Sequence, residues 1–102
     1  MAHTLSVDFE WDDAKDLLNQ EKHDLSFAEA RSLFESEVDY LEIFDSEHSD
    51  FEDRFIAIGP IEQRLVVVVY TQREEDIIRI IGARWANKRE QSLYRSYMEQ
   101  YR

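Results

Sequence analysis

The first third of the chain shows the 3.6-residue spacing of apolar side chains that is typical of amphipathic helices. Asp12 is placed to cap a first helix, which we expect to end near His23. Its apolar face is expected to consist of Ala14, Leu17 and Leu18. Ser26 and Glu29 form a capping-box pattern, which predicts a second helix that ends within residues 35–37. The stripe expected to be buried on this helix comprises Phe27, Ala30, Leu33 and Phe34.

From residue 40 onward the pattern changes to short runs of β-branched and aromatic residues, which predict strands. Four strands are expected, at residues 40–44, 54–58, 64–71 and 77–84. The third contains four consecutive valines and is too apolar for an edge, so we expect it to be central. A last helix is expected at residues 87–101, with one face that carries Tyr94, Tyr97, Met98 and Tyr101.

The order of these elements predicts an α+β fold. Two N-terminal helices and a C-terminal helix would cover one side of a four-stranded antiparallel sheet, because short connections favour antiparallel neighbours. A length of 102 residues fits a single domain over residues 1–102. No segment has the pattern of a signal peptide or the length of a membrane span, so we expect a cytoplasmic protein without a membrane partner.

Charge is distributed unevenly along the chain, whose net charge is -11. Residues 1–63 hold 18 acidic and 4 basic residues, whereas residues 64–102 hold 5 acidic and 8 basic residues. Residues 35–53 contain nine acidic residues and no lysine or arginine. Such a field repels a polyanion at long range. We therefore expect either a local cationic cleft, or an acidic surface that docks a basic partner, or both.

Candidate chemistry is concentrated in the cationic half and at a few histidines. Arg79 lies between two pairs of isoleucines, and Arg84 follows at the strand end just before a helix, as a phosphate clamp would. The other candidates are Lys22, His23, His48, Glu52, Arg54, Arg73, Lys88 and Arg89. RNA cleavage by attack of the 2′-hydroxyl requires a base, an acid and a cation that stabilises the phosphorane, and these residue types supply all three without a metal. With no cysteine and no closely spaced histidines, we expect no metal and no cofactor.

Each candidate also has a purely structural interpretation. Lys22 and His23 are residue types that stabilise the C-terminus of a helix. His48 is in a polar turn and fits a solvated loop histidine. Arg54 follows two acids and fits a surface ion pair. Arg84 fits a cap of the preceding loop, and the tyrosine stripe of the last helix fits a core or an interface.

Several stretches, in order along nearly the whole chain, resemble the BrnT family of bacterial type II toxins. They are FEWD (9–12), KH (22–23), SFAEA (26–30), Asp45 and His48 with Glu52 and Arg54, VVVVYTQR (66–73) and RIIGARWANKREQSLY (79–94). The resemblance implies a RelE-like fold and an endoribonuclease that inhibits translation. It also implies a BrnA-like antitoxin that neutralises the toxin, and contact with operator DNA only through the complex with that antitoxin.

The resemblance also suggests roles for individual residues. Lys22, His23, Arg79 and Arg84 are the positions expected to be catalytic. Arg79 and Arg84 would bind phosphate and stabilise charge in the transition state, His23 would transfer protons, and Lys22 would orient phosphate. RNA binding would involve Arg54, Arg73, Lys88 and Arg89, with Glu52 and Glu90 in support.

Two positions depart from the family pattern. Gly82 replaces the serine of the strand-end S-A-R motif, and Asp24 replaces the glycine after the Lys-His pair. Together with the net charge of -11, they leave two alternatives open. The chain would then be an attenuated toxin, or a non-catalytic acidic module that binds a basic protein.

Overall fold

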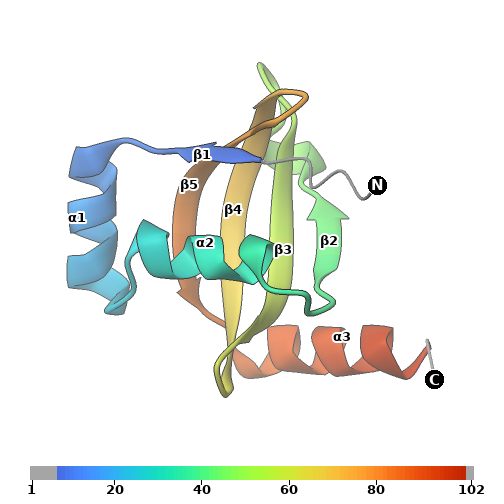
Figure 1. Ribbon diagram of the computed structural model, residues 1–102. Coiled ribbons are helices and arrows are strands. Elements are labelled where there is room, and N and C mark those ends of the chain that lie inside the picture. The colour runs from blue at the N-terminus through green and yellow to red at the C-terminus, as the bar shows by residue number, and fades with distance from the viewer. Residues whose placement is uncertain (1–6, 101–102) are drawn as a thin grey trace, which may run out of the picture.

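The centre of the fold is a five-stranded mixed sheet with strand order β1-β5-β4-β3-β2 (Figure 1). The computed structural model describes residues 7–100. Four strands are joined in antiparallel pairs along the chain: β2 (Leu41–Phe44), β3 (Arg54–Ile61), β4 (Arg64–Glu74) and β5 (Ile77–Trp85). The α+β class and these four strands were predicted from the sequence, and the valine run is central as expected.

The fifth strand, β1 (Asp8–Glu10), was not predicted, and it pairs with β5 in parallel. The expectation of a four-stranded, wholly antiparallel sheet was therefore wrong. A strand of three residues is too short to show an alternating pattern, and its partner lies about 70 residues away, in register Glu10↔Arg79. Only tertiary packing places it at the edge of β5.

Three α-helices complete the described part of the fold. At the N-terminus of each helix, a capping side chain accepts a hydrogen bond from a backbone amide. In α1 (Asp13–His23) the side chain of Asp12 accepts a hydrogen bond from the Lys15 amide. In α2 (Phe27–Glu35) the predicted capping box of Ser26 and Glu29 is present, and α3 (Lys88–Glu99) has a second capping box of its own. The expected position of Tyr101 lies outside the described residues.

The core lies between α2 and one face of the sheet. The buried residues of this cluster are Leu25, Phe27, Ala30, Leu33, Ala57, Val66, Val68, Tyr70, Ile80 and Ala83. Three of the four residues predicted for the stripe of α2 are buried, and Phe34 is half-buried against the ring of Tyr70. The hydroxyl of Tyr70 donates to Glu42, and burial raises its pKa well above the usual range. Most of these core residues lie in the α2 stripe or in the strands that the sequence predicted.

The expected apolar face of α1 does not pack. Leu17 and Leu18 are 63% and 53% exposed, and α1 has no buried residue. Helix α1 lies beside β5 instead, where the side chain of Asn19 accepts from the Ala83 amide at 3.2 Å and donates to the Leu25 carbonyl at 2.9 Å. A polar side chain therefore attaches this helix to the sheet, and the helical periodicity misidentified its contact face.

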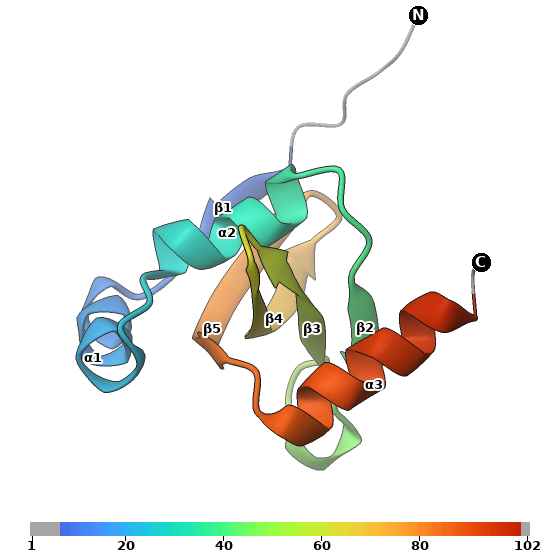
Figure 2. The same ribbon diagram turned by 90° about the horizontal axis from the view of Figure 1, so that it is seen from below.

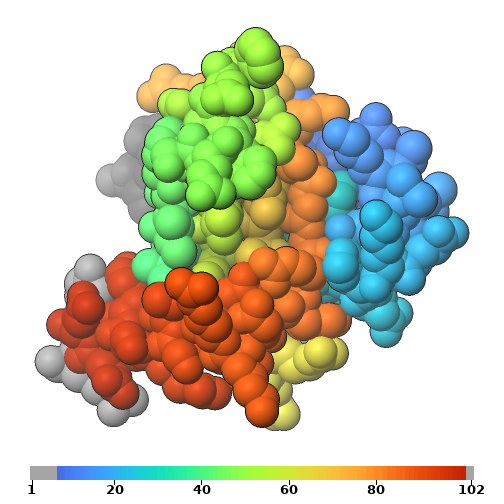
Figure 3. Space-filling model, turned by 180° about the vertical axis from the view of Figure 1, so that it is seen from behind, coloured from blue at the N-terminus to red at the C-terminus, as the bar shows by residue number. Residues whose placement is uncertain are grey.

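All three helices were expected to cover one side of the sheet, and this prediction was wrong. Helix α2 crosses one face, whereas α3 lies past the strand ends toward the opposite face (Figure 2). Seen from behind, that opposite face is framed by the segment around 45–53, by α1 and by α3 (Figure 3). We call it the open face. None of the described helices is long and apolar enough to span a membrane.

A β-bulge in β5 decides which side chains reach the open face. Val69 pairs with Gly82 but the next residue, Tyr70, pairs with Ile80, so Ile81 has no partner of its own. In a regular strand, residues an odd number apart point to opposite faces. Because of the bulge, Arg79 and Arg84 point to the same face, opposite the core.

The two glycines provide a matched test of this assignment of faces. A Cβ at Gly59 would lie 2.7 Å from Leu33 Cδ1 and 2.8 Å from Tyr40 Cβ, whereas a Cβ at Gly82 would meet nothing within 4 Å. Neither glycine has a positive φ. We expect Gly59→Ala to lower the free energy of unfolding by about 1–3 kcal/mol. Gly82→Ala should leave it unchanged or raise it by up to about 1 kcal/mol. Urea denaturation of both variants measures this, and equal effects would contradict it.

Candidate functional site

The open face carries a row of polar side chains across four strands. Arg54 on β3 pairs with Thr71 on β4, Thr71 pairs with Arg79 on β5, and Arg79 pairs with Glu10 on β1. Residues paired in this way point to the same face of a sheet. Thr71 is buried and its hydroxyl donates to the Asp53 carbonyl, whereas Arg54, Arg79 and Glu10 are each partly exposed to solvent.

Arg79 and Arg73 share one carboxylate. The Nη1 atoms of both arginines lie 2.9 Å from Oε2 of Glu10. Two guanidinium groups are thereby held next to each other at one end of the open face. Glu10 was not among the predicted residues of the site, because nothing in its local sequence indicates that β1 lies beside β5.

Arg84 forms the second cationic group, at the other end of β5. Its Nη1 and Nη2 atoms bind Glu90 in bidentate fashion at 2.7 and 2.6 Å. The hydrogen bonds from Arg84 hold the pKa of Glu90 below its usual range, against the opposing effect of burial. Glu90 also accepts from the Asn87 amide in the capping box of α3. Glu90 therefore joins the strand end to the start of the helix.

The depressed pKa of Glu90 predicts a pH-dependent contribution to stability. A carboxylate whose pKa is lowered by folding stabilises the native state at neutral pH, and this stabilisation is lost as the pH falls through its folded pKa. We expect Glu90→Gln to lower the free energy of unfolding by about 0.5–1 kcal/mol at pH 7, because Arg84 is partly exposed, and to have a progressively smaller effect as the pH is lowered into the acidic range. Glu99→Gln, at the exposed end of α3, is the control. A pH-independent difference would contradict the assignment.

Arg79 and Arg84 form two cationic groups rather than one. They are five positions apart along the strand, which corresponds to about 16 Å between their Cα atoms. Each guanidinium has its own carboxylate partner. A single phosphate is therefore not bound by both side chains in this arrangement, but two phosphates of one RNA strand are within their span.

The remaining basic candidates lie near the Arg84 end. Lys22 is exposed and His23 half-buried at the end of α1, one turn beyond the Asn19 contact with β5. Lys88 and Arg89 are exposed in the first turn of α3. Within residues 7–100 the side chains of these four residues form no ion pair. The structure thus brings them to the same end of the sheet without joining them into one cluster.

A third group lies in the loop between β2 and β3. His48, in a short 3-10 turn (Ser46–His48), places Nδ1 2.9 Å from Oδ2 of Asp45. Arg54 Nε lies 3.9 Å from Oε1 of Glu52. These side chains surround a hollow of about 440 Å³, which is lined by Glu47, His48, Asp50, Phe51, Glu52 and Arg54.

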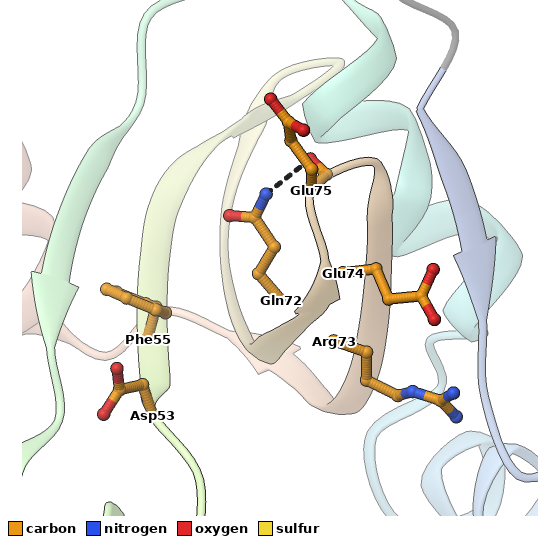
Figure 4. A pocket seen from close by; sticks show the side chains of 6 residues that line it. All are labelled: Asp53, Phe55, Gln72, Arg73, Glu74 and Glu75. Carbon is orange, nitrogen blue, oxygen red and sulfur yellow. Dashed lines mark hydrogen bonds between the residues drawn. The ribbon is translucent and has the colours of Figure 1, made fainter.

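Another hollow, of about 410 Å³, lies beside the turn between β4 and β5. Asp53, Glu74 and Glu75 contribute three carboxylates to its lining. In Figure 4, Arg73 points toward β1 and away from Asp53, while the side-chain amide of Gln72 donates to the Glu75 carbonyl at 2.7 Å. Within the described part of the chain, no group of three or more His, Asp or Glu side chains is arranged to hold a metal.

Comparisons with known proteins agree on one family. A family model described as a ribonuclease toxin, BrnT, of type II toxin–antitoxin systems matches residues 11–90. A crystal structure of the Brucella abortus ribonuclease toxin BrnT superposes with a TM-score of 0.65 at 23% identity, over 81% of this chain and 100% of that one. No curated protein sequence matches this chain. The structural likeness supports the fold, and the family model covers the region that carries the arginine groups.

Proposed function

Because the chain belongs to the BrnT family of ribonuclease toxins of type II toxin–antitoxin systems, we propose that it is an endoribonuclease whose substrate lies along the open face. The observation that supports this placement is the bulge at Ile81, which directs Arg79 and Arg84 to the same uncovered face. Arg73 and Arg54 extend the first of these cationic groups, whereas Lys88 and Arg89 flank the second.

The proposed reaction uses the 2′-hydroxyl of the RNA as nucleophile. Its oxygen forms a bond to the neighbouring phosphorus while the bond from phosphorus to the 5′ oxygen breaks, which leaves a 2′,3′-cyclic phosphate and a 5′-hydroxyl. One group of the protein accepts the proton of the 2′-hydroxyl and another donates a proton to the 5′ oxygen. Arginines stabilise the charge on the phosphorane oxygens, so this proposal needs no metal.

Proton transfer requires a group close to the same phosphate as the cation. Two histidines lie within the described residues, on different elements. His23, the candidate proposed from the sequence, ends α1, whereas His48 lies in the loop beside Arg54. Lys22, next to His23, remains a proposed phosphate contact.

A basic antitoxin is the proposed protein partner. Membership of a type II toxin family implies an antitoxin, and the acidic segment 35–53 offers a surface for basic residues of such a chain. The BrnA-like identity of that antitoxin, and contact with operator DNA only through its complex, are part of the proposal. An antitoxin that covers the open face would exclude RNA from both arginine groups.

The test is cleavage of bulk RNA by the purified chain in EDTA, followed by analysis of the product ends. Cleavage that yields 2′,3′-cyclic phosphate and 5′-hydroxyl ends is expected. Cleavage that occurs only with added Mg²⁺ would contradict metal independence. A folded chain that cleaves no RNA with or without Mg²⁺ would contradict the ribonuclease proposal and favour the acidic interaction module.

A further inference from the structure

The loop between β2 and β3 is closed by a set of short hydrogen bonds. The Asp45 amide donates to the Arg54 carbonyl at 2.8 Å, and the Arg54 amide donates to Oγ of Ser49 at 3.0 Å. The hydroxyl of Ser49 in turn donates to the Asp45 carbonyl at 2.6 Å. His48 and Arg54 are therefore held on one small, closed segment, although they are six positions apart in the sequence.

His48 is oriented by a carboxylate but accessible. Its Nδ1 lies 2.9 Å from Oδ2 of Asp45, whose side chain is 15% exposed, while the His48 side chain is 63% exposed. An ionised carboxylate can only accept, so Nδ1 carries the hydrogen and Nε2 is the nitrogen left for another partner. A histidine held in this way is arranged to exchange a proton through Nε2 with a bound molecule.

Arg54 has a donor that folding leaves unused. Its Nε is buried and makes no hydrogen bond within the described residues, and the nearest carboxylate oxygen, on Glu52, lies 3.9 Å away. Because Nε is closed to solvent, a bound anion would contact the exposed part of the guanidinium; the Arg54 side chain as a whole is 35% exposed. Arg54 also flanks Thr71 opposite Arg79, so this side of the hollow continues into the arginine row.

Phe51 has no packing role within the described structure. Its ring is fully exposed, and it lies on the rim of the same hollow as His48 and Arg54. Exposed aromatic rings next to cationic side chains are the usual stacking platforms for unpaired bases. A ring, a cation, an oriented histidine and the carboxylate of Glu52 thus surround one space of about 440 Å³.

We infer that this hollow binds one unpaired nucleotide of the RNA and performs the proton transfers of its cleavage. The inference rests on the proposed ribonuclease function and makes it specific. The base stacks on Phe51 and Arg54 holds the phosphate. Glu52 accepts the proton of the 2′-hydroxyl as oxygen attacks phosphorus. His48, as the imidazolium, gives its Nε2 proton to the departing 5′ oxygen, and exchange with water restores both groups.

This assignment replaces His23 as the proton-transfer residue. His23 is half-buried on α1, and within residues 7–100 no carboxylate orients its ring. Arg79 then has the role of binding a neighbouring phosphate, because it lies across Thr71 from Arg54. The hollow itself carries three carboxylates, so a strand is expected to approach it from the arginine side.

Activity of His48→Ala with and without imidazole tests the catalytic half of the inference. We expect kcat/KM for a short RNA to fall by about 100- to 10,000-fold, and added imidazole to restore part of it, because the site is open to solvent. A purely structural role of His48 would not give imidazole rescue. Loss of activity with rescue in His23→Ala, together with full activity of His48→Ala, would overturn the assignment.

Affinity for an RNA with 2′-O-methyl groups, which cannot be cleaved by 2′-hydroxyl attack, tests the binding half. Phe51→Ala is expected to weaken binding by about 5- to 150-fold. Phe44→Ala is the control, because Phe44 is also exposed but packs on Phe55 outside the hollow. Unchanged affinity of Phe51→Ala would overturn the nucleotide site.

The two tests separate this inference from the proposed function. If the wild-type chain cleaves RNA and the His48→Ala variant cleaves it equally fast, only the inference about this hollow is contradicted. A wild-type chain that cleaves no RNA contradicts the ribonuclease proposal and the proton transfers together. In that case the binding assay still decides whether the hollow holds a nucleotide.

Discussion

Alanine at Arg79 or at Arg84 is expected to lower kcat/KM for RNA cleavage by about 10- to 150-fold, because each variant loses a charge-assisted contact to a phosphate of the bound RNA, typically about 1.5–3 kcal/mol. Each side chain is held by a carboxylate, Glu10 or Glu90, in the direction of the open face. The measurement is kcat/KM on a defined RNA, together with arrest of translation after induced expression. Because the two side chains contact different carboxylates and lie far apart, the effects of the two substitutions on kcat/KM should multiply in the double variant.

Arg95→Ala provides the control for these arginine variants. Arg95 is exposed on α3, and among the residues that the structure describes its side chain donates a hydrogen bond only to Gln91 on the same helix, at 3.5 Å. It should retain wild-type activity. Salt dependence of RNA affinity supplies a second measurement, since each phosphate contact on a single strand contributes about -0.7 to the log–log slope, and each arginine variant should lose about one such contact. Activity that survives in the double variant would contradict the placement of RNA on the open face.

Phe27→Ala is expected to lower the free energy of unfolding by about 3–5 kcal/mol, a large part of the roughly 5–15 kcal/mol that holds a typical domain folded. Phe27 is 1% exposed, and its ring packs edge-on against Trp11. Its amide also donates to Oδ1 of Asp16 at 2.8 Å, which joins α1 to α2. A cavity at this position would therefore loosen both helices, and urea denaturation followed by circular dichroism measures the loss.

The matched control is Phe51→Ala, which removes the same atoms from a fully exposed ring. It should change the free energy of unfolding by no more than about 0.5 kcal/mol. The comparison also matters for function, because a Phe51 variant with normal stability and weakened RNA binding isolates the contribution of the ring. Equal effects of the two substitutions would contradict the contrast between a buried Phe27 and an exposed Phe51, and a loss below about 1 kcal/mol in Phe27→Ala would contradict its place in the core.

Local signals predicted most of the fold. The Ser26 capping box and the valine run of β4 are short-range patterns, and both correspond to the structure. Strand β1 was missed because its existence depends on a partner far along the chain. The prediction that Leu17 and Leu18 form the buried face of α1 was wrong, although their spacing is helical. The helix is attached to the sheet through Asn19 rather than through these leucines.

The candidate site was predictable by residue type but not by arrangement. Arg79 and Arg84 were identified from their positions at a strand and its end, and the structure places both on the open face. The sequence did not indicate that Glu10 binds Arg79, since that contact requires β1. The bulge could not be inferred either, because Ile80 and Ile81 are chemically alike and only pairing with β4 distinguishes them.

The bulge has a consequence for how length changes in this region would be tolerated. Removal of Ile81 would place Ile80 directly before Gly82, so the present pairs with β4 would follow in regular alternation and Arg79 and Arg84 would both stay on the open face. Removal of a residue elsewhere in β5, with the bulge retained, would instead exchange inside for outside for the side chains on one side of the deletion. The guanidinium of Arg84 could then enter the apolar layer that Ala83 now fills. We expect natural variation to tolerate loss of the extra residue at the bulge better than loss of a residue elsewhere in this strand.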